Sequence, residues 1–357
     1  MGWFSKKQES EGVKVSAEAE APPAIVEEEI EAVDEADEEE IARPPTPAAL
    51  ADLFLVLEEH LTEIELEELS EIVASIPQPP PLVDRLTRGL EDMEELREAI
   101  LSSPTLSAEV LRVVNSAAFM LRTPISSIEH AVTYLGATMV KGLVVQSAVA
   151  QVMSFETDVQ KAAYMRVWRS SIIASAAAHA FAEALRFEHP SVFATRALLA
   201  NVGDLALISA RPSMASIYAP HSTLLARVEE QQAEIMANSA ILSSLLAREW
   251  KLPEDLFTAL RYSITPLSWP PDQETRSAKE QREDVLLYLA CRVGDAIAYG
   301  GLKEIEEFRI LGVESLDFFY LPEYLRRLDL GDLLLLLQDP NRNRRIRQTA
   351  EKFSEEL

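Results

Sequence analysis

The chain has 357 residues, of which 48% are hydrophobic, so it carries enough apolar mass for a large folded core. Its formal net charge of -26 at pH 7 excludes a nucleic-acid backbone or an anionic membrane surface as the main partner, because like charges repel. The single cysteine, Cys291, excludes an intramolecular disulfide and fits a reducing compartment, where its apolar neighbours favour a buried small side chain. We therefore expect a cytoplasmic protein whose partners are other proteins.

The first 45 residues are predicted to form a disordered acidic tail. Residues 16–42 contain no Lys or Arg, while Asp and Glu are dense, and such a segment repels itself and has little apolar surface to bury. Two interpretations stay open, a solubilising tail and a docking tail for a basic surface. We expect neither a signal peptide nor an integral membrane segment, because apolar runs such as residues 333–337 are far shorter than the ~20 residues that cross a bilayer.

Residues 46–76 are predicted to form an N-terminal helical segment, either one helix or a broken pair. Thr46-Pro47 is typical of an N-cap followed by proline at the first helical position. The proline-rich run from Pro77 to Pro81 breaks any helix and marks the start of the main domain. The apolar face of the segment consists of Leu53, Leu55, Leu57, Leu61, Ile64 and Leu66.

Residues 77–300 have helical periodicity in nearly every segment and no convincing alternating strand. Apolar residues recur at spacings of three and four, as at Leu106, Val110 and Val114. The predicted fold class is all-α, a compact multi-helix globule. Helix starts are predicted at Ser103-Pro104, at the capping-box pattern Ser126-Ser127-Ile128-Glu129 and at Leu252-Pro253, and one alanine-rich helix presents Trp168, Ile172, Ala176 and Ala180 on one face.

Residues 301–357 are predicted to be a C-terminal helical extension. A dense apolar and aromatic group leaves two interpretations open, packing onto the domain and a partner or dimer surface. The basic patch Arg342 to Arg347 could pair with the acidic tail or be a solvated helix face, and both remain open. The aromatic group consists of Leu316, Phe318, Phe319, Tyr320, Leu321 and Tyr324.

No catalytic motif is apparent, and the sequence predicts no catalytic residue, no metal ligand and no cofactor. A divalent hydrolase site needs clustered His and Asp, whereas the five histidines are scattered and none is followed by Asp. Asp204 and Asp295 could meet in the fold, but carboxylates on helices are usually surface groups or helix partners. Asn115 and Ser116, an amide and a hydroxyl at a helix end, could bind a ligand group or cap the helix, and we favour capping.

A series of short motifs, taken together, resembles the HDOD domain of bacteria and runs in the family's order. They are Pro80-Pro81-Leu82, Ser103-Pro104-Thr105-Leu106, Leu111-Arg112-Val113-Val114-Asn115-Ser116-Ala117, Pro124-Ile125-Ser126-Ser127-Ile128-Glu129-His130-Ala131-Val132, Leu135-Gly136, Val167-Trp168-Arg169-Ser170-Ser171, Ala197-Leu198-Leu199 with Gly203, Trp250-Lys251-Leu252-Pro253, and Ala259-Leu260-Arg261-Tyr262.

The resemblance implies an all-helical relative of the HD phosphohydrolases, found in signalling proteins beside two-component, chemotaxis and cyclic diguanylate systems. Many members lack metal-binding residues, and this chain departs further at the positions where the family often carries histidines or a His-Asp pair. Those degenerate positions are Ser170, Ala200, Asn201, Asn238 and Ser263.

We therefore predict a non-enzymatic bacterial signal-transduction regulator or adaptor that acts by protein-protein interaction. The expected partners are signalling proteins of two-component, cyclic diguanylate or motility systems, and a homo-oligomer is left open. One alternative is a nucleotide sensor that binds a cyclic dinucleotide in the former catalytic cleft. The other is a cryptic metal-dependent phosphohydrolase.

Overall fold

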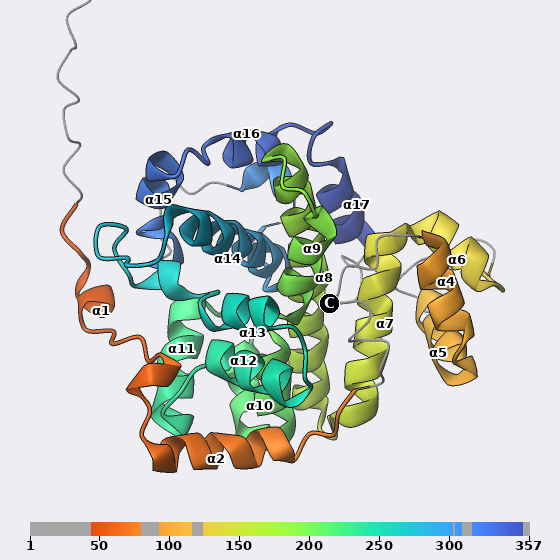
Figure 1. Ribbon diagram of the computed structural model, residues 1–357, viewed down its shortest axis with the longest axis horizontal. Coiled ribbons are helices and arrows are strands. Elements are labelled where there is room, and N and C mark those ends of the chain that lie inside the picture. The colour runs from red at the N-terminus through yellow and green to blue at the C-terminus, as the bar shows by residue number, and fades with distance from the viewer. Residues whose placement is uncertain (1–43, 80–92, 116–123, 303, 309–315, 353–357) are drawn as a thin grey trace, which may run out of the picture. The chain divides into compact units, whose positions relative to one another are not determined.

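The computed structural model describes residues 44–79, 93–115, 124–302, 304–308 and 316–352 (Figure 1). Throughout these ranges the regular secondary structure is helical and no strand occurs, which confirms the predicted all-α fold class. The chain divides into two units at Pro45, and the larger one runs from Thr46 to Leu357. The predicted acidic tail lies outside the described residues, apart from Pro44 and Pro45.

The N-terminal helical segment is broken into more pieces than the sequence predicted. It forms α1 (Ala48–Ala51), a 3-10 turn (Glu58–His60) and α2 (Glu63–Ala74), with extended backbone in between. The predicted N-cap at Thr46 is wrong, because the N-cap of α1 is Pro47. The side-chain cap of the segment is Thr62, which accepts from the Glu65 amide at the start of α2.

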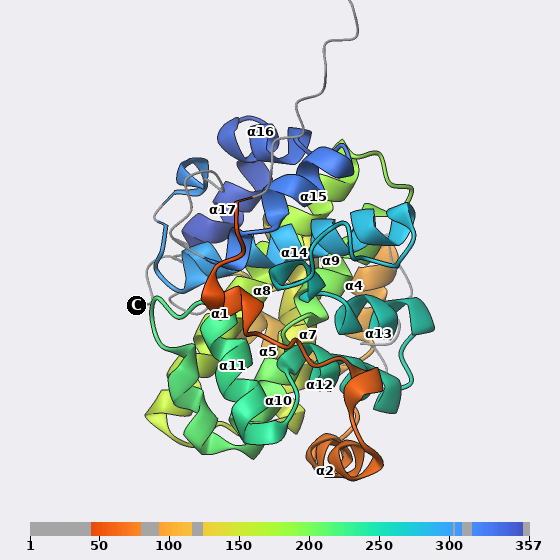
Figure 2. The ribbon, with the colours of Figure 1, turned by 90° about the vertical axis from the view of Figure 1, so that its left-hand side faces the viewer.

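The extended stretch before α2 is joined to the main domain by hydrogen bonds of the Val56 backbone. Inside a helix the same amide and carbonyl would bond within the helix. The Val56 amide donates to Gln232 Oε1 at 2.9 Å, and its carbonyl accepts from Asn238 Nδ2 at 2.8 Å. Further along, α2 packs against α10 (Val202–Ala210) and α12 (Ser239–Glu249), as Figures 1 and 2 show. The segment is thus part of the folded core.

Two long helices form the centre of the fold. The alanine-rich α8 (Asp158–Ala184) packs along α14 (Ala278–Ala298), and α9 (Pro190–Leu199) packs against α8 as well. Small side chains let α8 and α14 approach closely: a Cβ atom on Gly294 would lie 2.3 Å from the Ser170 carbonyl oxygen. The predicted apolar face of α8 is buried, since Trp168, Ile172, Ala176 and Ala180 are all at most 7% exposed.

The remaining helices of the main domain cover this pair from two sides (Figure 1). The capping box predicted at Ser126 is wrong by one residue, because Ser127 is the N-cap of α6 and accepts from the His130 amide at 3.1 Å. The predicted start after Pro253 is confirmed. The helices that cover α8 and α14 are α4 (Met93–Leu101), α5 (Pro104–Val114), α6 (Ile128–Leu135) and α7 (Ala137–Val152), then α10, a 3-10 helix (Pro212–Tyr218), α11 (Leu224–Ile235), α12 and α13 (Glu254–Arg261).

The C-terminal extension packs onto the central helices. It contains α15 (Leu321–Arg327), α16 (Asp332–Gln338) and α17 (Arg344–Lys352), with α15 against α14 and α17 against α8. The aromatic group is largely internal, because Tyr320, Leu321 and Tyr324 are buried and Phe318 and Phe319 are half-buried. These side chains support packing onto the domain.

Within the part of the chain that the structure describes, one segment, residues 190–210, is long and apolar enough to span a membrane, with a mean hydropathy of 1.4 in its window. The sequence pattern did not reveal it. It consists of α9 and α10 with a break at Ala200 and Asn201, and 83% of the window is buried inside the protein. Core helices of folded domains pass the same length and composition test, and the burial fits that explanation.

Candidate functional site

The degenerate positions Ser170 and Ala200-Asn201 lie on neighbouring elements. Ser170 sits in the middle of α8 and is fully buried, whereas Ala200 and Asn201 form the two-residue connection between α9 and α10. Asn201 Nδ2 donates to Ser171 Oγ at 3.1 Å, which joins the connection to α8. The tertiary structure therefore brings Ser170, Ala200 and Asn201 into one region, as the resemblance implies for the family's metal-binding positions.

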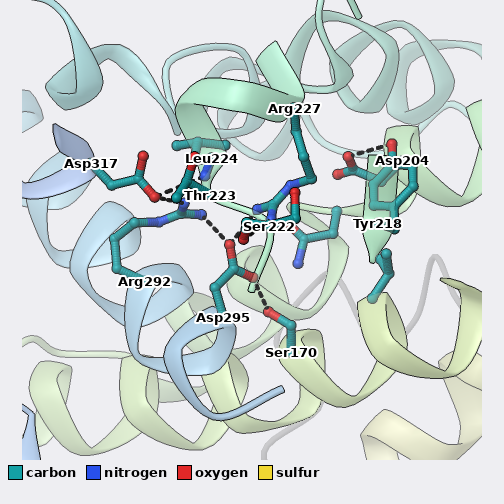
Figure 3. A network of polar contacts seen from close by, with 12 residues as sticks. Ser170, Asp204, Tyr218, Ser222, Thr223, Leu224, Arg227, Arg292, Asp295 and Asp317 are labelled. Carbon is teal, nitrogen blue, oxygen red and sulfur yellow. Dashed lines mark hydrogen bonds and ion pairs between the residues drawn. The ribbon is translucent and has the colours of Figure 1, made fainter. Parts of the chain in front are cut away.

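Asp295 on α14 is the acidic centre of this region (Figure 3). Ser170 Oγ donates to its Oδ1 at 2.5 Å. Its Oδ2 accepts from Arg227 on α11 and lies 3.1 Å from Arg292 Nη2. Both carboxylate oxygens are thus engaged, one by a hydroxyl and the other by two guanidinium groups.

Arg227 supplies the positive charge closest to this carboxylate. Its side chain is 5% exposed, its Nη1 donates to the Ser222 carbonyl at 3.2 Å, and its guanidinium lies over the Tyr299 ring at 4.4 Å. Burial lowers the pKa of Arg227, but the charges of Asp295, Tyr299 and Asp204 and the hydrogen bond to Asp295 together outweigh it and hold the pKa above its usual value. Burial likewise raises the pKa of Asp295, while Arg227 and Arg292 bring it below its ordinary range. Both groups are therefore charged at neutral pH.

Asp204 on α10 lies in the same network but has a different set of partners. Its Oδ1 accepts from the Tyr218 hydroxyl at 2.9 Å and from Gln231 Nε2 at 3.0 Å. Burial raises the pKa of Asp204, and the charge of Arg227 opposes that shift only in part. Asp204 and Asp295 do enter one network, yet Arg227 interacts electrostatically with both and stands between them in Figure 3.

A third carboxylate, Asp317, closes the network at the start of α11. It accepts from the backbone amides of Leu224 at 2.8 Å and Leu225 at 2.9 Å, and it lies 4.0 Å from Arg292 Nη1. An anionic group at a helix N-terminus is stabilised by the free amides and the helix dipole. Asp317 therefore fixes the entry of α11 and, through it, the position of Arg227.

The other degenerate positions make local structural bonds. Asn238 caps α12 by accepting from the Ile241 amide at 3.2 Å, and Ser263 donates to the Leu260 carbonyl at 2.7 Å. The Ala200 side chain is buried and has no donor atom, while its carbonyl accepts from Ser243 Oγ at 2.8 Å. These hydrogen bonds stabilise the ends of helices.

Asn115 joins the end of one helix to the segment before the next. Its Nδ2 donates to the carbonyls of Leu111 at 2.8 Å and Ile125 at 2.7 Å, and its Oδ1 accepts from the Ile125 amide at 2.7 Å. All of its amide atoms are thus used to join the end of α5 to the segment before α6, as the favoured capping interpretation requires. Ser116 lies outside the described residues.

The residues at this centre do not fit a catalytic divalent cation. Such a site needs imidazole and carboxylate ligands with free lone pairs, whereas here Ser170, Ala200 and Asn201 stand beside a carboxylate already paired with two arginines. Among the described residues no group of three or more His, Cys, Asp or Glu side chains could hold a metal ion. Arg227 occupies the electrostatic role that a bound cation would have.

The sequence did not predict the arginines, Tyr218 or Gln231 as members of the site. Arg292 and Asp295 share the i, i+3 spacing of a helical ion pair, so that one contact is readable from the chain. Arg227 is 68 residues from Asp295, and no local pattern joins them. Cys291 was expected to be buried and inert, and burial raises the pKa of its thiol to about 12.

A cavity of about 320 Å³ adjoins the network. The charged residues of its lining are Arg292, Asp295, Glu307 and Asp317, and the aromatic ones are Tyr299, Phe308 and Phe318. His221, Ser222 and Thr223 lie at the same cavity, just before α11.

A sequence model of the HDOD domain matches residues 76–266. No curated protein matches the chain. Among solved structures, an HDOD domain protein of unknown function from Geobacter sulfurreducens is 19% identical with a TM-score of 0.53, over 82% of this chain and 98% of that one. A candidate signal transduction protein from Marinobacter aquaeolei VT8 is 16% identical with a TM-score of 0.53, over 86% and 69%. A candidate phosphohydrolase from Shewanella amazonensis SB2B is 19% identical with a TM-score of 0.49, over 80% and 98%.

Proposed function

The chain belongs to the HDOD domain family, and from that premise we propose that it is a signal-transduction regulator that works without catalysis, by binding other proteins. The family and the name of the Marinobacter relative support the signalling role. The expected partners are proteins of two-component, cyclic diguanylate or motility systems, and a second copy of the chain is a further candidate.

One observation carries the non-catalytic part of the proposal. The Asp295 carboxylate is satisfied by Ser170, Arg227 and Arg292, and a charged guanidinium already neutralises it. A cation that entered would have to displace a buried arginine, and leaving a buried charge unpaired costs several kcal/mol. Hydrolysis through a metal-activated water is thus disfavoured by the residues themselves.

Metal analysis tests this part directly. The full chain is expressed in medium supplemented with iron, manganese and zinc, purified without chelator, and measured by inductively coupled plasma mass spectrometry. We expect far less than one ion per chain for each metal. Stoichiometric metal, retained in wild type and lost in Asp295→Asn, would support the cryptic phosphohydrolase instead.

Partner binding is tested by crosslinking and quantitative mass spectrometry in the native host. The full chain is compared with a chain lacking residues 1–45, and an unrelated acidic protein of similar abundance serves as the control. We expect a kinase, cyclase or motility component at near-stoichiometric yield from the full chain. Loss of that partner on truncation would assign docking to the acidic tail, and failure of both chains to enrich any protein would refute the adaptor role.

A further inference from the structure

The cavity beside the Asp295 network has the size of a small-molecule site. Its volume of about 320 Å³ falls at the lower end of the ~300–1,000 Å³ typical of ligand pockets. Tyr299, Phe308 and Phe318 contribute aromatic surface to its lining, and the Phe308 and Phe318 rings meet edge to face at 5.6 Å. The cavity thus combines aromatic side chains with the charged groups of the network.

Arg292 is a buried side chain of this lining with unmet hydrogen-bonding capacity. It is 3% exposed, and its Nη2 pairs with Asp295, but its Nε and Nη1 donate no hydrogen bond to any of the residues that the structure describes. The distance of 4.0 Å between Arg292 Nη1 and Asp317 Oδ2 is too long for a hydrogen bond. Buried donors are almost always satisfied, because leaving one unpaired costs about 1–3 kcal/mol.

The acceptors around Arg292 are already committed to other donors. Both oxygens of Asp295 are used by Ser170 and the two arginines, and both oxygens of Asp317 accept from the amides of Leu224 and Leu225. At the buried end of the cavity, Arg292 therefore keeps two donor atoms without an acceptor, whereas the third carboxylate of the lining, Glu307, is exposed. The N-terminal end of α11, a helix of 12 residues, borders the same cavity, and Asp317 already occupies it.

We propose that this cavity binds a small organic anion, whose phosphate or carboxylate oxygens accept from Arg292 and whose planar body packs on Tyr299, Phe308 and Phe318. A charge-assisted bond to a guanidinium suits both kinds of oxyanion. The volume suits one nucleoside phosphate or an aromatic acid and is small for a cyclic dinucleotide. The proposal concerns ligand binding by the isolated chain, so it stands or falls independently of the partner interaction.

Isothermal titration calorimetry on the purified full chain tests the proposal. Four probes separate the chemistries: guanosine monophosphate and adenosine monophosphate as organic phosphates, benzoate as an aromatic carboxylate, and inorganic phosphate as the anion without a body. We expect saturable binding of at least one organic probe at one site per chain, at least tenfold tighter than inorganic phosphate.

Three variants locate the binding site. Arg292→Gln removes the anchoring charge, Ala296→Trp fills the cavity from its half-buried lining, and Arg326→Gln changes an exposed arginine on α15 as the matched control. We expect Kd to rise at least tenfold in the first two variants and to stay unchanged in the third. Ala296→Trp decides the question if Arg292→Gln fails to fold, as judged by circular dichroism.

Three outcomes would overturn the proposal. The first is that none of the organic probes binds the wild-type chain. The second is that a probe binds with the same Kd to the folded cavity variants, which would place it elsewhere. The third is that inorganic phosphate binds as tightly as the organic probes, since the aromatic side chains would then contribute nothing.

Discussion

At the level of single residues, Arg227 connects the buried polar groups at the centre of this protein. Its guanidinium forms an ion pair with Asp295, and its Nη1 donates to the Ser222 carbonyl in the turn before α11. The Tyr299 ring covers the flat face of the same guanidinium. Ser170, one of the positions that the resemblance marks as degenerate, is therefore part of a buried polar network in which its hydroxyl and the Arg227 guanidinium satisfy the Asp295 carboxylate.

Replacing Arg227 by Met should destabilise the fold by about 3–5 kcal/mol, because Asp295 and the polar groups around it lose a buried partner. Guanidinium chloride denaturation followed by circular dichroism measures this change. Arg326→Met, at an exposed position, should change the free energy of unfolding by less than about 0.5 kcal/mol. A cost below about 1 kcal/mol for Arg227→Met would show that the ion pair is not a structural requirement.

Asp284 on α14 should make stability depend on pH. Burial raises its pKa from 3.8 to about 7, although its ion pair with Arg276 opposes the shift. Between these two values the folded state holds a proton that the unfolded state releases, so this residue's contribution to the free energy of unfolding falls as pH rises.

We expect the wild type to lose on the order of 3 kcal/mol of stability relative to Asp284→Asn between pH 4 and pH 7. Denaturation curves of both proteins at several pH values give the difference. A wild-type-minus-variant difference that stays constant over this window would contradict the raised pKa.

The contact between α8 and α14 is the decisive feature at the level of elements. It sets Ser170 against Asp295, and it depends on the absence of a side chain at Gly294. The break between α9 and α10 matters in the same way, because it places Asn201 within bonding distance of Ser171 on α8.

Gly294→Ala should destabilise the protein by about 3 kcal/mol or more, since the new methyl group would meet backbone atoms of α8 that cannot move alone. Gly142→Ala on α7 is the matched control. Its new Cβ would have contacts no closer than 3.5 Å, so alanine should stabilise the helix by about 0.5–1 kcal/mol. Thermal unfolding of both variants checks the contrast, and equal melting temperatures would count against the close-packing explanation.

On the scale of the whole molecule, the N-terminal segment belongs to the folded domain. Leu55, Leu57 and Leu69 are at most 2% exposed. Glu58 forms ion pairs with Arg248 and Arg261, which are distant in the sequence. The family model begins only at residue 76, so this segment is an addition to the matched region that shares its core.

A chain that begins at residue 46 should melt at the same temperature as the full chain. A chain that begins at residue 80 should melt more than about 10 °C lower and expose apolar surface, because it loses the buried leucines of the segment. Differential scanning calorimetry with dye binding measures both effects. Equal melting temperatures for the two truncated chains would mean that the segment packs too weakly to matter.

The sequence by itself determined the all-α fold and the family, since helical periodicity is local and the motifs keep their order along the chain. The resemblance also marked Ser170, Ala200 and Asn201, because they stand where the family often has histidine or aspartate. The sequence misplaced the cap at Ser126, where the neighbouring Ser127 has the same capping propensity, and the cap at Thr46, where the helix begins one residue later. The ion pair of Arg227 with Asp295 and the cavity beside Arg292 were decided only by the tertiary structure. Helix packing brings these distant side chains together, and which of them meet depends on crossing angles and close approaches that no local pattern encodes.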